Sequence, residues 1–112
     1  MARRLTVLLH RLWATTALIS TYYSQLHAIH EWCAEAGVRP ELARDYLVAM
    51  VGALDRMAED GAPLDALARE AATPGGLNEM ALARLRRGTL FPDLEAVLDA
   101  ILARIEPEAG TP

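Results

Sequence analysis

The sequence predicts an all-α fold, and three observations support that prediction. Apolar residues recur at three- and four-residue spacing along most of the chain, and no stretch shows the two-residue alternation of a strand. Glycine and proline separate the helical segments. We therefore expect one helical domain, residues 1–112, of about five helices. The apolar fraction of 53% is high for a small monomer, which favours cover by a partner subunit.

The first two predicted helices are the longest. The first runs from about Leu5 to Ala36 and ends at Gly37. Its apolar residues cover more than one face, which predicts a helix buried on two sides. Pro40 suits a first helical position, and the second helix continues from it to Met57 with regular three- and four-residue spacing.

Three shorter helices complete the predicted domain. Residues 60–63, Asp-Gly-Ala-Pro, stop the second helix and start a short third one over residues 64–71. A fourth helix ends at Gly88, and Pro92 starts the fifth. Residues 106–112 are expected to form a frayed tail.

Charge, cysteine usage and hydropathy narrow the class of protein. The net charge of −4 argues against a nucleic-acid partner, although residues 32–47 mimic a helix-turn-helix. Cys33 is the one cysteine, which excludes a disulfide framework and favours a reducing, cytoplasmic setting. The longest uncharged run, residues 12–30, is too polar for a membrane span.

Neither a cofactor loop nor a complete metal site is evident. None of the seven glycines has dinucleotide-loop spacing after a strand, so we expect no cofactor bound by this chain alone. His27 and His30 are three residues apart, with Glu31 adjacent, but a third ligand is not evident. We therefore expect no metal, and interpret both histidines as polar residues at a helix–helix or subunit contact.

The segment Thr-Pro-Gly-Gly-Leu-Asn-Glu, residues 73–79, is the candidate binding site. Gly75 and Gly76 let a backbone approach a ligand closely, and the helix that follows presents free N–H groups that suit a carboxylate or phosphate. Thr73 and Asn78 add a hydroxyl and an amide. The alternative is a tight helix-to-helix turn with a side-chain cap.

Two segments in this order carry a resemblance to a known family. They are Ala-Gly-Val at 36–38 followed by Pro-Glu-Leu-Ala at 40–43, and the short helix at 64–70 leading into Ala-Thr-Pro-Gly-Gly-Leu-Asn-Glu at 72–79. The chain resembles the C-terminal dimerisation domain of pyrroline-5-carboxylate reductases over about residues 13–105.

The resemblance implies a helical domain that interlocks with its twin subunit, with the active site at the dimer interface. It implies that Thr73, Gly75, Gly76 and Asn78 face the substrate carboxylate. The implied reaction is hydride transfer from NAD(P)H to a cyclic imine, which yields proline. Catalytic residues are not assigned.

Three departures from the family pattern shape the functional hypothesis. Asn78 stands where family members usually carry Thr, and residues 15–20 lack the glycine of the Ser/Gly-rich turn that approaches cofactor and substrate. We also see no nicotinamide-binding pattern in these 112 residues, so we expect that domain to lie in a longer form of the protein, on a separate chain, or to have been lost. We expect a homodimeric substrate-site domain, inactive alone. The alternative is a non-catalytic dimerisation module that kept the fold and lost the chemistry.

Overall fold

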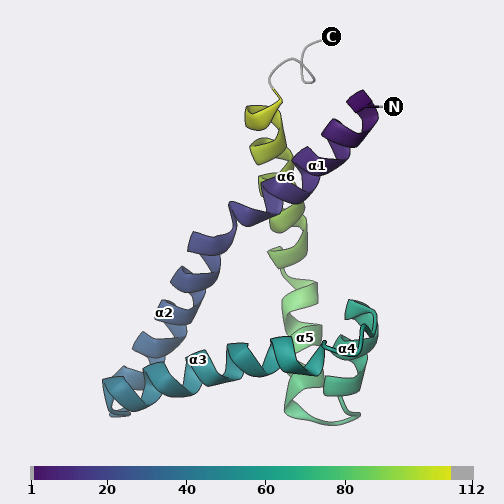
Figure 1. Ribbon diagram of the computed structural model, residues 1–112. Coiled ribbons are helices and arrows are strands. Elements are labelled where there is room, and N and C mark those ends of the chain that lie inside the picture. The colour runs from purple at the N-terminus through teal and green to yellow at the C-terminus, as the bar shows by residue number, and fades with distance from the viewer. Residues whose placement is uncertain (1, 107–112) are drawn as a thin grey trace. The chain divides into compact units, whose positions relative to one another are not determined.

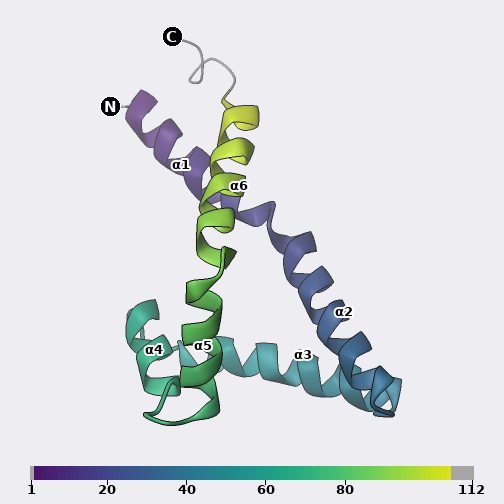
Figure 2. The same ribbon diagram turned by 180° about the vertical axis from the view of Figure 1, so that it is seen from behind.

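The computed structural model describes residues 2–106, and within them the chain is helical without a strand, which confirms the all-α prediction. Figures 1 and 2 show the helices from opposite sides. They are α1 (Ala2–Thr16), α2 (Ile19–Glu35), α3 (Pro40–Met57), α4 (Leu64–Ala71), α5 (Leu77–Arg87) and α6 (Leu90–Ile105). None of these helices has both the length and the apolar character needed to cross a membrane.

The chain divides into two compact units. One comprises Met1–Tyr22 and Leu85–Pro112, and the other comprises Tyr23–Arg84. The single-domain organisation expected from the sequence stays a prediction.

Glycine and proline mark several helix boundaries as expected. Gly37 follows α2 with a φ of +95°, a left-handed conformation in which glycine carries no steric penalty. Pro40 begins α3, where its missing N–H costs no helical hydrogen bond. Residues 60–63 separate α3 from α4, and Gly61 there has a φ of +80°.

The single first helix predicted from the sequence is wrong, because two helices occupy that stretch. Thr15 Oγ1 donates to the Leu12 carbonyl at 2.7 Å, and Thr16 Oγ1 donates to the Trp13 carbonyl at 2.6 Å. The Leu18 N–H bonds the Thr15 carbonyl, three residues back rather than four. Side-chain hydroxyls that bond preceding carbonyls bend helices, which accounts for the break between α1 and α2.

The last helix begins earlier than expected. It starts at Leu90 after Thr89, so Pro92 lies in its first turn instead of at its first position. Proline is tolerated there because the N–H groups of a first turn have no helical acceptor. Within the predicted tail, Glu106 follows the helix, and residues 107–112 lie outside the described part of the chain.

In the first unit, α1 packs against α6. Ala14 and Leu18 are buried, at 3% and 6% exposure. His10 Nδ1 lies 2.6 Å from Glu106 Oε2, which joins α1 to the end of α6. His10 is half-buried in this contact.

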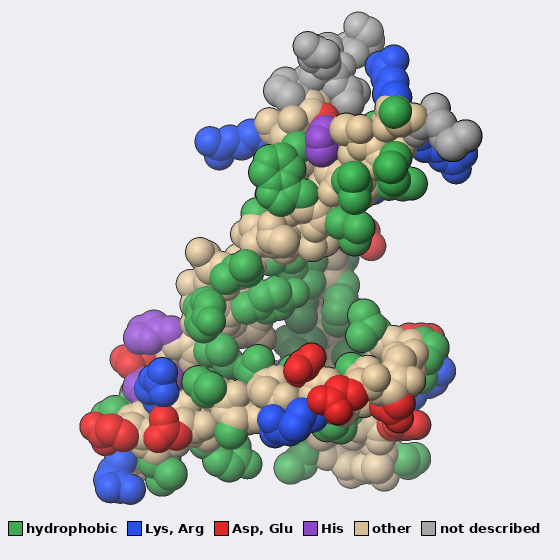
Figure 3. Space-filling view, viewed as in Figure 1, with side chains coloured by type: hydrophobic (Ala, Val, Ile, Leu, Met, Phe, Trp, Pro, Cys, Tyr) green, Lys and Arg blue, Asp and Glu red, His purple; other side chains and the backbone are tan. Residues whose placement is uncertain are grey.

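In the second unit, the buried apolar side chains among the described residues are those of Ala43 and Leu47, both on α3. Many large apolar side chains elsewhere in the unit are exposed, including Trp32 at 72% and Leu77 at 80%. Figure 3 shows hydrophobic side chains at the surface along α2 and α3. This unit therefore leaves most of its apolar side chains uncovered.

Candidate functional site

The predicted binding segment forms the connection between α4 and α5. Gly75 has a φ of +76°, and the Gly76 N–H donates to the Thr73 carbonyl at 2.9 Å, so the chain turns tightly here. Thr73, Gly75 and Gly76 therefore lie in one turn, and Asn78 lies in the first turn of α5. The side chains of Thr73 and Asn78 are exposed.

Both glycines have a conformational reason to be present. The positive φ of Gly75 is one that side chains rarely adopt. A Cβ atom on Gly76 would lie 2.7 Å from Thr73 Oγ1 and 3.1 Å from the Thr73 carbonyl oxygen. The turn alone thus explains the Gly-Gly pair, whether or not a ligand binds.

The beginning of α5 already holds a carboxylate from its own first turn. The Gly75 N–H donates to Glu79 Oε1 at 3.1 Å. The sequence prediction of a side-chain cap is therefore met by Glu79, a residue it did not single out as the cap. An acidic residue in a first helical turn was the signal, because it favours the positive end of the helix dipole.

Three N–H groups at this helix start stay open. Those of Leu77, Asn78 and Glu79 have no acceptor among the described residues, as expected for a first helical turn. The Asn78 side chain makes no hydrogen bond within the described chain. The segment can therefore still donate several hydrogen bonds to an anion, beside the carboxylate of Glu79.

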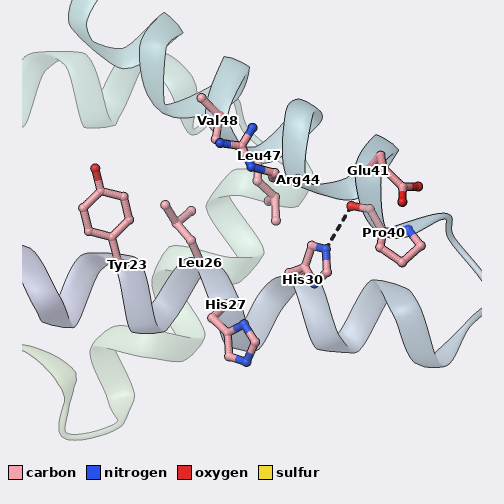
Figure 4. Close-up of a pocket in the computed structure, with 9 residues that line it drawn as sticks. All are labelled: Tyr23, Leu26, His27, His30, Pro40, Glu41, Arg44, Leu47 and Val48. Carbon is pink, nitrogen blue, oxygen red and sulfur yellow. Dashed lines mark hydrogen bonds between the residues drawn. The ribbon is translucent and has the colours of Figure 1, made fainter.

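A separate group of polar side chains, His27, His30 and Glu31, lies on α2 beside α3 within the second unit. It borders a pocket of about 430 Å³ that is lined by Tyr23, Leu26, His27, His30, Pro40, Glu41, Arg44, Leu47 and Val48 (Figure 4). His30 Nε2 donates to the Pro40 carbonyl at 2.9 Å. This hydrogen bond confirms that His30 lies at a helix–helix contact.

The two histidines of this cluster are neighbours on α2. Their ring centroids are 6.4 Å apart, and the planes differ by 12°. His27 is exposed, whereas His30 is half-buried beside α3. His30 Nδ1 is buried without a hydrogen-bond partner, and Glu31 Oε1 lies 3.5 Å from it.

A comparison with protein families shows which family the chain belongs to. A family described as pyrroline-5-carboxylate reductase dimerisation matches residues 13–107, close to the predicted 13–105. The chain belongs to this family. No curated protein and no solved structure shows a significant match.

Membership of the pyrroline-5-carboxylate reductase dimerisation family confirms the resemblance seen in the sequence. It identifies the chain as a dimerisation domain, for which self-association is the characteristic property. The matched range includes both the α4–α5 connection and the cluster on α2.

Proposed function

We propose that the chain forms a homodimer and serves as the substrate-site domain of a pyrroline-5-carboxylate reductase-like oxidoreductase. The enzyme would use NAD(P)H to make proline in the cytoplasm. The main observation that supports a homodimer is that many large apolar side chains are exposed, in a chain that belongs to a dimerisation family.

The extent of this exposure supports the burial of these apolar side chains by a second, identical subunit. Leu64 is 80% exposed, Tyr46 is 70% exposed and Leu54 is 62% exposed. Burying one such side chain contributes about 1.5–3 kcal/mol. A second copy can cover many of them at once, because a two-fold interface uses the same apolar patch on both subunits.

The proposed substrate contact is the start of α5. The open N–H groups of Leu77 and Asn78, with the side chains of Thr73 and Asn78, could donate to the carboxylate of the cyclic imine or of proline. Gly75 and Gly76 would permit the close approach. In this proposal Glu79 is a competing internal anion that weakens the site.

The nicotinamide cofactor would bind a domain other than this one. The hydride would reduce the carbon of the imine C=N bond, and the nitrogen would take a proton, which gives proline. The alternative function, a non-catalytic dimerisation module, is favoured by the Glu79 carboxylate at the helix start.

A proline titration separates these two functions. If the α4–α5 connection binds substrate, the backbone amide signals of residues 73–79 should move, with millimolar affinity because the cofactor side of the site is absent. Charge-assisted hydrogen bonds contribute about 1.5–3 kcal/mol each, before ordering costs.

Two matched variants sharpen the titration. Asn78→Ala should weaken the shifts, whereas Glu79→Gln should strengthen them because it removes the competing charge. Unmoved amides at high millimolar proline in both wild type and Glu79→Gln would reject the substrate role and leave the non-catalytic module.

The cofactor assignment has its own test. NADPH should produce no saturable change in the fluorescence of Trp13 and Trp32 when added to this chain alone. Saturable binding at micromolar NADPH would contradict the assignment of the cofactor to another domain.

A further inference from the structure

We propose that His27, His30 and Glu31 form a binding site for a divalent transition-metal ion of the Zn²⁺ class. One potential ligand atom from each of the three residues lies within 4.8 Å of the others. This inference departs from the expectation that the chain binds no metal, and it is independent of the proposed enzymatic function.

The spacing of the three residues explains why they meet. Residues three and four positions apart are neighbours on one helix face, so His30 and Glu31 lie on either side of His27. All three belong to α2, a continuous helix of 17 residues. The site therefore requires neither a second subunit nor a second unit of the chain.

The hydrogen bond to Pro40 prepares His30 for this role. A carbonyl oxygen can only accept, so His30 Nε2 carries the ring proton and Nδ1 presents its lone pair. Metal-bound histidines commonly donate their other ring N–H to a carbonyl, which fixes the tautomer and the ring orientation. Nδ1 is also the atom that is buried without a hydrogen-bond partner.

The spacing of the ligand atoms suits tetrahedral coordination. Zn–N and Zn–O bonds of about 2.0–2.2 Å at tetrahedral angles separate neighbouring ligand atoms by about 3.4 Å. His30 Nδ1 and Glu31 Oε1 are 3.5 Å apart. A ligand atom of His27 lies within 4.8 Å of ligand atoms of the other two residues, and its ring is exposed, so a side-chain rotation can complete the set.

The charge around the cluster permits a cation. Glu31 supplies a negative charge, and α2 has no basic residue in its last turn. Arg44 borders the same pocket, but its guanidinium lies 3.1 Å from the Asp45 carboxylate. With two nitrogen ligands and one carboxylate from the protein, a fourth position is left for water.

Competition for Zn²⁺ between the full chain and a chromogenic chelator tests the site. We expect one Zn²⁺ per chain with a Kd of roughly micromolar order. His27→Gln should weaken binding at least about tenfold, since losing even a supporting group around a metal has that effect. Glu31→Gln should also weaken it.

His10→Gln is the matched control, because His10 is the remaining histidine and lies on α1. This variant should keep wild-type affinity. Equal affinity in wild type and His27→Gln would overturn the proposal, and so would one Zn²⁺ shared by two chains.

The nitrogen resonances of the histidine rings give a readout that does not depend on variants. On addition of Zn²⁺, His30 Nδ1 should shift strongly while Nε2 keeps its proton. A shift confined to His10, or equal small shifts in all three histidines, would contradict the site.

Discussion

Among single residues, Gly75 and Gly76 show how one dipeptide can serve a turn for two different reasons. Gly75 takes a left-handed backbone conformation, whereas Gly76 leaves room for Thr73. A third glycine, Gly52, lies inside α3 with a negative φ. A Cβ there would meet Arg56 Nη1 at 3.5 Å, an ordinary contact distance.

These differences predict that replacing glycine with alanine has opposite effects on stability at Gly76 and at Gly52. Gly76→Ala should lower the free energy of unfolding by about 1–3 kcal/mol, because the new methyl group collides with Thr73. Gly52→Ala should raise it by about 0.5–1 kcal/mol, because glycine weakens a helix interior. Urea unfolding at fixed protein concentration checks both. A neutral Gly76→Ala would show that the turn is looser than described.

Among the helices, α5 has a start that is stabilised by a residue of its own first turn. Glu79 combines a hydrogen bond to the Gly75 N–H with a charge near the positive helix end. Asn78, which the sequence predicted as a ligand-binding side chain, makes no comparable side-chain contact in the described chain.

Stability measurements should therefore rank the two residues. Glu79→Ala should lower the free energy of unfolding by about 1 kcal/mol, as expected for a lost helix cap. Asn78→Ala should change it much less. Thermal unfolding followed by circular dichroism distinguishes them, and a larger loss for Asn78→Ala would assign the cap to Asn78 instead.

The sequence predicted most helix boundaries, because glycine and proline act locally. Gly37, Pro40 and residues 60–63 impose backbone conformations that need no tertiary contact. The break after Thr16 was not predicted, because the apolar periodicity continues through it. The hydroxyl hydrogen bonds that bend the chain do not alter the spacing of apolar residues.

The sequence predicted the turn at residues 73–79 but not the side chain that caps it, and ligand binding there stays a prediction. Helix-start chemistry identified residues 73–79, yet the selection of Glu79 over Asn78 depends on which side chain can reach the Gly75 N–H. The Pro40 carbonyl that orients His30 comes from another helix. Contacts of that kind require the fold, since residue spacing within one helix does not contain them.

For the whole molecule, the central feature is the scarcity of buried apolar side chains. Among the described residues, Ala14, Leu18, Ala43 and Leu47 are the buried apolar ones. Exposed aromatic and aliphatic side chains occur in both units, such as Trp13 at 60% and Trp32 at 72%. Exposed apolar surface of this extent is typical of chains that are covered by a partner.

Light scattering during size-exclusion chromatography tests the homodimer most directly. The chain mass is 12.2 kDa, and we predict a species of twice that mass at micromolar concentration. Dilution should not separate the subunits before helical circular dichroism is lost, because the apolar side chains of each copy depend on the other for cover. A stably helical monomer of 12.2 kDa would contradict the homodimer.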